Sequence, residues 1–205
     1  KKRGYHLKTI DEFEIGYSPE NYNALENKAK ETSYSIEPLK KAGLIKENEK
    51  GNYDFFRGRI IFPIKSVTGQ YIAIGGRIIS NEKYLAKYIN SPETKFFKKG
   101  NNLYNLDKAR KFSNTSEEVF LVEGYMDVIG LFKNKIENCV ANLGTSLTDK
   151  QILILNQFFN EIVICFDSDE SGYKAAVRAA ENSINELIPE RQISFLFLPN
   201  GEDPD

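Results

Sequence analysis

The stretch from Val119 to Asp127, VFLVEGYMD, constrains the fold of this chain more than any other part of the sequence. Four apolar or aromatic residues run directly into Glu123, Gly124 permits a sharp turn, and helical spacing begins at Tyr125. A short apolar run that ends in a turn and a helix is typical of a buried strand in a parallel sheet. Glu123 is therefore predicted at the carboxyl end of a strand, where open α/β sheets bind their ligands.

The same pattern recurs downstream. The apolar run 161–166 leads into Asp167-Ser168-Asp169, and the run 193–198 leads to Gly201-Glu202-Asp203-Pro204-Asp205. Right-handed crossovers would make all the strands parallel, with helices on both faces of a central sheet. Residues 117–205 are thus predicted to form an α/β domain, with strands at 119–122, 138–142, 161–166 and 192–198, and helices at 125–134, 149–159 (with Thr148 as N-cap) and 171–188.

Residues 1–112 are predicted to form a separate α+β subdomain, followed by a polar linker at 113–116. Spacing in the first 50 residues is mainly helical, and includes a short helix at 38–45 that Gly43 closes. The runs 59–64 and 71–79, joined by a Thr68-Gly69 turn, predict a β-hairpin. The Gly75-Gly76 pair late in the second run predicts a bulge or a close approach of backbone.

Charge is distributed unevenly along the 205 residues. Residues 1–112 hold 22 Lys+Arg and 13 Asp+Glu, a net charge of +9, whereas residues 113–205 hold 6 and 16, a net charge of −10. This asymmetry favours one half that attracts polyanions and another that holds cations. The alternative is two solvated surfaces whose compositions have drifted apart.

Composition excludes several classes of protein. No apolar run approaches the roughly 20 residues of a membrane span, and the sequence does not begin like a signal peptide. Cys139 and Cys165, the two cysteines, both fall in predicted strands, which indicates buried thiols and a cytoplasmic location. Because no Cys/His cluster exists and His6 is the only histidine, a structural zinc site is not expected. Both ends look like cuts in a longer protein.

The carboxylates at the strand ends suit hard cations. Oxygen-rich sites without cysteine or histidine favour magnesium or manganese, and Asp167 and Asp169 could bracket an ion together with Glu123. Metal ions of this kind support phosphoryl chemistry by orienting the reactants and neutralising charge. An Asp-rich turn with no ligand is the alternative for a single Asp-x-Asp. Acids at three strand ends of one sheet favour the metal site.

Basic and aromatic residues alternate in the first half. Arg57, Arg59 and Arg77 surround the predicted hairpin, where contact with phosphate is at least as plausible as simple solvation. Within residues 83–111, basic side chains can attract phosphates and aromatic faces can stack on bases. The candidates there are Lys87, Tyr88, Asn90 and Lys99, whereas Phe96 and Phe97 are expected in the core.

Several of these motifs resemble one protein family. LVEGYMDV, ANLGTSLT, CFDSDESGYKAA and FLPNGEDPD resemble the topoisomerase-primase (Toprim) domain of bacterial DnaG-type replicative primases. RGRIIFPI, GGR, KYINSPETKFFKKGNNLYNL and the opening KRG resemble the rest of that family's RNA-polymerase core. The resemblance spans essentially the whole chain. It divides the chain into a basic N-terminal subdomain at 1–112 and a Toprim domain at 117–205, with a core at about 117–199 and an acidic tail at 200–205.

The resemblance implies DNA-directed synthesis of short RNA primers on a single-stranded DNA template, by attack of a 3′-hydroxyl on the α-phosphate of a ribonucleoside triphosphate. It implies two or more Mg²⁺ or Mn²⁺ ions, no zinc in these residues, and a replicative helicase as partner through a region outside them. The family's metal-binding and catalytic acids match Glu123, Asp167 and Asp169, and its further acidic positions match Asp127, Asp203 and Asp205. Its template- or nucleotide-facing positions match Arg3, Arg57, Arg59, Arg77, Lys87, Tyr88, Asn90 and Lys99.

Some departures and alternatives remain. The family more often has glycine where Ser168 stands and a small residue such as alanine where Ser171 stands. An extended exit would point Ser168 away from its flanking aspartates, so tolerance is expected. Another Toprim enzyme, either a topoisomerase or a nuclease, and a non-catalytic nucleic-acid-binding module stay open, as does whether this part of the polymerase core is active alone.

Overall fold

The structure, a computed structural model, describes residues 6–80, 84–144, 146–186, 188–199 and 202. The described residues group into two compact units. The first comprises those up to Ile64 together with Ile72–Phe96, and the second comprises Lys65–Tyr71 together with those from Phe97 onward. Each unit has its own sheet, so each is described separately.

The first unit is built on a four-stranded sheet in the order β1-β4-β5-β6. Its strands are β1 (Gly16–Ser18), β4 (Arg59–Lys65), β5 (Tyr71–Ile78) and β6 (Tyr88–Asn90). The predicted hairpin forms β4 and β5, and Gly69 at its turn has a φ of +87°, a left-handed conformation that glycine adopts without strain. Phe62 and Ile64 of β4 are fully buried, which anchors the strand in the core of this unit.

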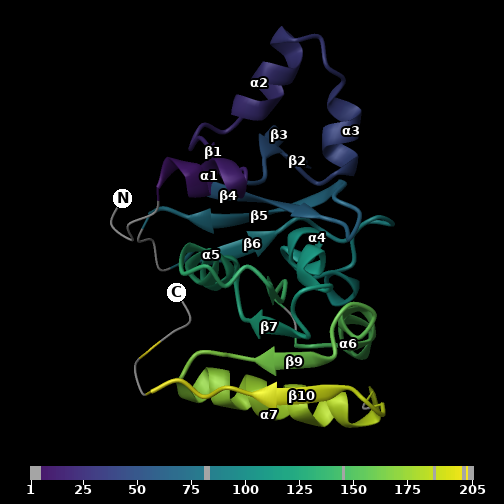
Figure 1. Cartoon of the computed structure of the whole chain (residues 1–205). Coiled ribbons are helices and arrows are strands. Elements are labelled where there is room, and N and C mark those ends of the chain that lie inside the picture. Colours follow the sequence, from purple (N-terminus) through teal and green to yellow (C-terminus); the bar gives the residue numbers. More distant parts are fainter. Residues whose placement is uncertain (1–5, 81–83, 145, 187, 200–201, 203–205) are drawn as a thin grey trace. The chain divides into compact units, whose positions relative to one another are not determined.

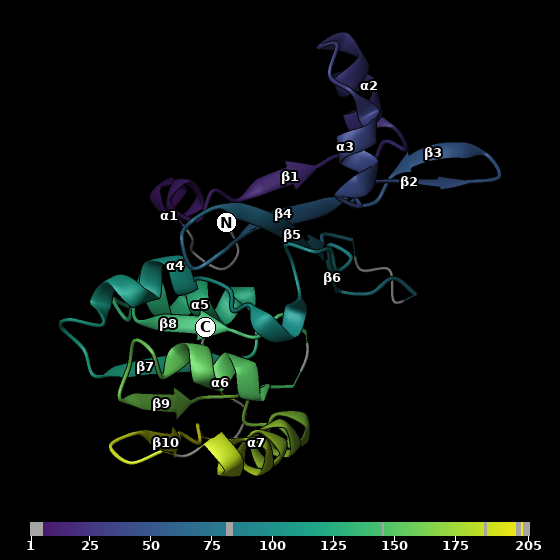
Figure 2. The same ribbon diagram turned by 90° about the vertical axis from the view of Figure 1, so that its right-hand side faces the viewer.

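Three helices and a second hairpin complete the first unit (Figure 2). The antiparallel hairpin pairs β2 with β3 beside the helices, and Asp54 at the end of β3 accepts hydrogen bonds from the first backbone N–H groups of α2. That carboxylate serves as a tertiary cap for the helix N-terminus. The bounds are α1 (Leu7–Glu12), α2 (Ala24–Glu31), α3 (Ile36–Lys41), β2 (Ile45–Asn48) and β3 (Gly51–Asp54).

The second unit is built on a parallel sheet in the order β8-β7-β9-β10, whose four strands are all labelled in Figure 2; Figure 1 labels β7, β9 and β10. The strands are β7 (Glu118–Val122), β8 (Cys139–Ala141), β9 (Glu161–Ile164) and β10 (Gln192–Phe195). The helices are α4 (Leu106–Ala109), α5 (Tyr125–Lys133), α6 (Asp149–Leu155) and α7 (Glu170–Ser183), with short 3₁₀ turns η1 (Lys99–Asn101), η2 (Arg110–Phe112) and η3 (Ile184–Glu186).

The strand order places helices on both faces of this sheet. The chain moves from β7 to β8 in one direction and then from β8 past β7 to β9 and β10 in the other. Right-handed crossovers therefore put α5 on one face and α6 and α7 on the opposite face. Val119 and Leu121 of β7 pack in one buried cluster with Ile152 of α6 and Ala176 of α7, as this arrangement requires. The predicted fold class is confirmed.

Several predicted boundaries are wrong. The short helix predicted at 38–45 is α3, which ends at Lys41, because Gly43 (φ +70°) turns the chain and Ile45 begins β2. The helix predicted at 149–159 ends at Leu155, and that predicted at 171–188 is α7 followed by η3. Phe97 is fully buried as expected, but Phe96 is 72% exposed, because neighbours in an extended segment point to opposite sides.

Residues 97–112 pack within the second unit. The backbone of Tyr104 exchanges hydrogen bonds with Ala141 of β8 (N···O 2.9 and 3.2 Å), and the Asn105 side chain donates to the Cys139 carbonyl (2.9 Å).

Cys139 and Cys165 are both free and buried, as predicted. Among the described helices, none combines the length and the apolar character that crossing a membrane would require.

Candidate metal and nucleic-acid site

Glu123 follows β7 directly. The chain leaves β7 for one face of the sheet and leaves β9 for the other, so the carboxyl ends of these two central strands form the switch point at which open α/β sheets bind their ligands. Gly124 caps α5, and its N–H donates to the Asp127 carboxylate (N···Oδ2 2.8 Å). The predicted position of Glu123 at a strand end is confirmed.

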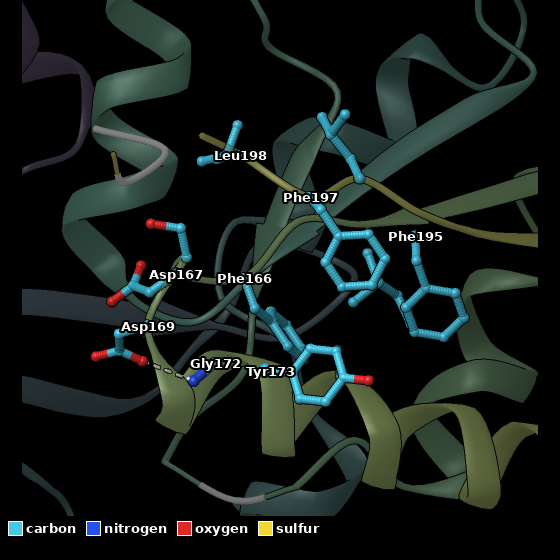
Figure 3. Close-up of a pocket in the computed structure, with 12 residues that line it drawn as sticks. Phe166, Asp167, Asp169, Gly172, Tyr173, Phe195, Phe197 and Leu198 are labelled. Carbon is cyan, nitrogen blue, oxygen red and sulfur yellow. Dashed lines mark hydrogen bonds between the residues drawn. The ribbon is translucent and has the colours of Figure 1, made fainter. Parts of the chain in front are cut away.

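The second acidic segment leaves β9 as a short turn into α7. Asp169 is the N-cap of α7, and its carboxylate accepts a hydrogen bond from the Gly172 N–H (2.8 Å), which is the dashed line in Figure 3. A Cβ atom on Gly172 would lie 2.0 Å from the Asp167 carbonyl oxygen. The helix can therefore begin this close to the turn only because residue 172 has no side chain.

Glu123 and Asp167 lie next to each other at this switch point. The Asp167 N–H donates to the Glu123 carboxylate (N···Oε1 3.3 Å). Burial raises the pKa of Glu123, and the negative charges of Asp167 and Asp169 raise it further, against the opposing effect of the Asp167 N–H. The charges of both aspartates thus reach the Glu123 carboxylate, which favours either a bound proton or a bound cation there.

Of the other predicted acids, one lies in the first turn of α5 and two lie outside the described residues. Asp127 caps α5 and lies near Cys165, whose pKa is raised by burial and then by the charges of Asp127 and Asp167. Asp203 and Asp205 lie outside the described residues. The Ser168 hydroxyl donates to the Glu202 carbonyl (2.8 Å), so Glu202 in the acidic tail is bonded to the turn between the two aspartates.

The oxygen donors at this switch point fit a hard cation that keeps part of its own water shell. Within the part of the chain that the structure describes, no group of three or more His, Cys, Asp or Glu side chains is already arranged around one ion. Mg²⁺ does not need such a cage, because it is commonly held by one or two carboxylates and completed by waters and substrate phosphates. Glu123 and Asp167 supply a carboxylate pair of this kind.

Two features near the acids have no counterpart in the sequence prediction. Asn142 follows the last paired residues of β7 and β8, Val122 and Ala141, so its register position is beside Glu123. Its side-chain oxygen is buried and has no hydrogen-bond partner among the described residues. The only signal in the sequence is a polar residue at a strand end, one position after a buried run.

The second feature is an apolar pocket of about 170 Å³ between α7 and the segment after β10. Figure 3 shows the carboxylates of Asp167 and Asp169 at one end and the rings of Tyr173 and Phe197 at the other. These two rings have centroids 6.2 Å apart. Periodicity could not predict this pocket, because the rings come from a helix face and an irregular segment 24 residues apart.

The predicted basic residues fall into separate groups. In the first unit, the guanidinium of Arg57 lies over the rings of Tyr22 and Tyr53 (4.9 and 5.2 Å to the centroids) and donates to the Asp54 carbonyl (2.6 Å). Arg77 pairs with Tyr88 across β5 and β6, and its guanidinium is 5.6 Å from the Tyr88 ring centroid.

The remaining positions are placed as follows. Lys87 is exposed, with its ammonium 5.8 Å from the same Tyr88 ring, and Asn90 pairs with Gly75. Lys99 belongs to the second unit, where its carbonyl accepts a hydrogen bond from Gln151 (3.2 Å). Arg59 is buried at the start of β4. Arg3 lies outside the described residues.

Comparison with known proteins gives one consistent match. Residues 1–110 match the N-terminal domain of the DNA primase catalytic core, and residues 120–205 match a Toprim-like domain. The chain is 41% identical over 204 residues to a DNA primase of Buchnera aphidicola, covering 99% of this chain and 35% of that protein. It is 40% identical over 206 residues to a DNA primase of Salmonella typhimurium, covering 100% and 35%.

Solved structures agree. A DNA primase domain from Pseudomonas aeruginosa superposes with a TM-score of 0.91 and is 40% identical, covering 99% of this chain and 63% of that one. A DnaG primase catalytic domain bound to single-stranded DNA has a TM-score of 0.88 and is 38% identical, covering 100% and 66%. The chain spans about a third of the length of the curated relatives that it matches. By sequence and by fold, the chain belongs to the family of bacterial DnaG-type DNA primases.

Proposed function

We propose that this chain is the metal-binding and template-binding part of a primase, a DNA-directed RNA polymerase that makes short RNA primers on single-stranded DNA for replication. The observation that carries the proposal is the meeting of Glu123 and Asp167 at the switch point of the parallel sheet, in a chain of the primase family. The reaction is nucleotidyl transfer, in which a ribonucleotide 3′-hydroxyl attacks the α-phosphate of an incoming triphosphate and pyrophosphate leaves.

The acids are proposed to bind two or more divalent ions. Glu123, Asp167 and Asp169 form the main set, supported by Asp127, Asp203 and Asp205. Bound Mg²⁺ or Mn²⁺ would neutralise charge on the phosphates and orient the attacking oxygen. Glu123 is held by the Asp167 N–H and has a raised pKa, so it suits either of two roles, a ligand or the acceptor of the hydroxyl proton.

The basic residues are proposed to hold the template and the ribonucleoside triphosphates. Arg57, Arg77 and Lys87 carry charge next to aromatic rings, a combination that attracts phosphates and stacks bases. Arg3, Tyr88, Asn90 and Lys99 complete the predicted contacts, and Arg59, which is buried, belongs to the set by its sequence match. The relative solved with single-stranded DNA supports this substrate class. We further propose a cytoplasmic protein that meets a replicative helicase through a region outside these residues.

A primer-synthesis assay tests the proposal. A full-length primase that carries this sequence would be given a single-stranded template, ribonucleoside triphosphates and Mg²⁺ or Mn²⁺. Glu123→Gln and Asp167→Asn should each lower primer yield by more than about 100-fold, since changes in the second shell of a metal site alone cost 10–100-fold. Glu181→Gln, an exposed acid on α7, is the matched control and should behave like wild type.

Three results would contradict the proposal. Unchanged yield in both acid variants would remove the catalytic assignment. A wild-type protein that binds template but makes no primer with either ion would favour a non-catalytic binding module. Cleavage or relaxation of DNA without ribonucleotide incorporation would favour another Toprim enzyme.

A further inference from the structure

Arg59 is the most deeply buried of the described arginines that the sequence assigns to the template. Only 6% of this residue is exposed, at the start of β4. Its guanidinium donates hydrogen bonds from Nη1 to the carbonyls of Ala86 (3.0 Å), Gly76 (3.4 Å) and Lys87 (3.4 Å). Burying a charged group costs free energy unless it is well hydrogen-bonded, so these carbonyls are what allows Arg59 to lie there.

Gly76 provides the space for the Arg59 side chain. A Cβ atom on Gly76 would lie 2.6 Å from a ring carbon of Phe56 and 3.1 Å from the Arg59 Cδ atom. Close packing at the Gly75-Gly76 pair is thus found, but what lies against Gly76 is side chains, the Phe56 ring first and then the stem of Arg59. Arg59, Phe56 and Gly76 therefore pack against one another.

The segment that Arg59 holds leads directly into β6. This is an edge strand of only three residues, and a strand this short has few ladder hydrogen bonds of its own. The Lys87 carbonyl also accepts from the Ile78 N–H (3.0 Å), so β5 and Arg59 share this anchor. The exposed face of the segment carries the Lys87 ammonium and the Tyr88 ring, with the Arg77 guanidinium beside it.

We infer that Arg59 is a positioning residue, which fixes the backbone of Ala86 and Lys87 and thereby presents Lys87 and Tyr88 to single-stranded DNA. The inference rests on the proposed function, because it takes Lys87 and Tyr88 as template contacts. It differs from the direct role that the sequence pattern suggests for Arg59. A guanidinium that is buried and bonded to carbonyls acts on the template through the segment it holds.

A double-mutant cycle tests the inference in a full-length primase that carries this sequence. Binding of a fluorescently labelled single-stranded DNA oligonucleotide would be measured by anisotropy over a range of salt concentrations. Lys87→Ala should weaken binding about three- to tenfold, and should reduce the slope of log K against log[salt] by about 0.7. Arg59→Lys keeps the charge but loses the planar fork, and should give a similar loss of affinity and of slope.

The combined variant decides between positioning and direct contact. If Arg59 acts through Lys87, Arg59→Lys should have little further effect once Lys87 is alanine. Additive losses would overturn the inference, and so would wild-type affinity and slope in Arg59→Lys. Wild-type binding by Lys87→Ala would instead show that the proposed template surface is wrong, and the inference would fall with it.

Two further variants guard against a simple folding defect. Gly76→Ala leaves the charge of Arg59 in place but forces the Phe56 ring and the Arg59 stem to move, so it should reproduce the binding defect of Arg59→Lys, and wild-type binding by it would contradict the inference. Lys28→Ala, an exposed lysine of α2 in the same unit, should leave affinity and slope unchanged. Thermal unfolding of each variant shows that the folded state is retained at the assay temperature.

Discussion

At the scale of single residues, Gly172 shapes the acidic turn between β9 and α7, because it has no side chain. Its missing Cβ is what allows α7 to begin against the Asp167 carbonyl, and its N–H fixes the Asp169 carboxylate. The turn between β9 and α7 thus depends on a residue that has no side chain to contribute to the site. The two aspartates can be read from the sequence, but this dependence cannot.

Replacing Gly172 by alanine should displace the turn. We expect Gly172→Ala to lower the free energy of unfolding by about 1–3 kcal/mol, the usual range for overpacking, and to lower primer synthesis strongly because Asp167 must move. Ser171→Ala, at an exposed position in the same turn, is the control and should change neither. Thermal unfolding and the primer assay measure the two effects, and wild-type activity in Gly172→Ala would contradict this account.

Glu26 shows how one buried carboxylate can contribute to stability in the first unit. Its side chain accepts hydrogen bonds from Asn23 (2.6 Å) and Asn52 (3.2 Å) and pairs with Lys30 (2.8 Å). Lys30, followed by the two asparagines, lowers the pKa of Glu26 from 4.5 to about 2. Because the folded pKa is depressed, the stabilisation is present above about pH 4.5 and is lost as pH falls toward 2.

We therefore expect Glu26→Gln to destabilise the protein by about 1–3 kcal/mol near neutral pH, where charge-assisted hydrogen bonds are lost. The difference in unfolding free energy from wild type should shrink as pH is lowered from about 5 toward about 3, because Glu26 takes up a proton more readily in the unfolded chain than in the folded one. Glu31→Gln is the control, since its carboxylate is exposed and pairs with Lys28 at the surface. Urea unfolding across this pH range measures both, and a pH-independent difference for Glu26→Gln would be inconsistent with the assignment.

At the scale of elements, α6 is held to the preceding segment through its first turn. Thr148 and Gln151 form a reciprocal capping box. The fully buried Gln151 amide also donates to the carbonyls of Asn102 (2.8 Å) and Lys99 (3.2 Å). The Gln151 side chain thus bonds both to the backbone at the start of α6 and to the carbonyls of the turn that carries Lys99.

Gln151→Leu should remove the capping box and the side-chain donor to the Asn102 carbonyl, whereas the Lys99 carbonyl keeps the Asn102 N–H (3.4 Å). We expect a loss of about 2 kcal/mol or more in the free energy of unfolding, because buried polar groups left unpaired cost about 1–3 kcal/mol each. Lys150→Gln, an exposed neighbour on the same helix, should stay within about 0.5 kcal/mol of wild type. Urea unfolding with unchanged m-values checks this, and equal stability of the two variants would show that the Gln151 hydrogen bonds contribute little to stability.

The sequence predicts some of these elements well for a physical reason. Strands β8 and β9 are almost entirely buried apolar runs, β7 is buried at three of its five positions, and Thr148 is a chemically typical N-cap for α6, so local pattern and tertiary environment agree. Strands β2 and β3, IKEN and GNYD, carry few apolar residues and pair only with each other, so no periodicity reveals them. Glu123 and Asp167 can be placed by strand ends, whereas Asn142 becomes visible only through register.

At the scale of the whole molecule, the uneven charge predicts how binding depends on salt. The net charge of +9 over residues 1–112 should attract single-stranded DNA, and the contribution of each phosphate contact is measurable as counterion release. The opposite charge of residues 113–205 should add nothing to this attraction. Removing a lysine from the basic half should therefore weaken DNA binding, whereas removing one from the acidic half should not.

We expect Lys99→Ala and Arg77→Ala each to weaken binding of a single-stranded oligonucleotide and to reduce the salt slope by about 0.7. Lys174→Ala is the control, because this exposed lysine of α7 pairs with Glu170 and lies in the acidic half of the sequence. Anisotropy titrations between about 50 and 200 mM salt cover the informative range. A wild-type slope for both Lys99→Ala and Arg77→Ala would remove them from the template surface.

The order and burial of the strands in the parallel sheet predict which amide hydrogens exchange first. β7 and β9 are the inner strands, and the Cys165 N–H continues their ladder to the Leu121 carbonyl (2.9 Å) immediately before the acidic turn. Partial opening of a sheet starts where a strand is least covered, which here is the partly exposed outer strand β10, because β8 is buried and its Ala141 is bonded to Tyr104. Glu123 and Asp167 are therefore attached to the more slowly exchanging ladder of β7 and β9, and fraying of β10 leaves their spacing intact.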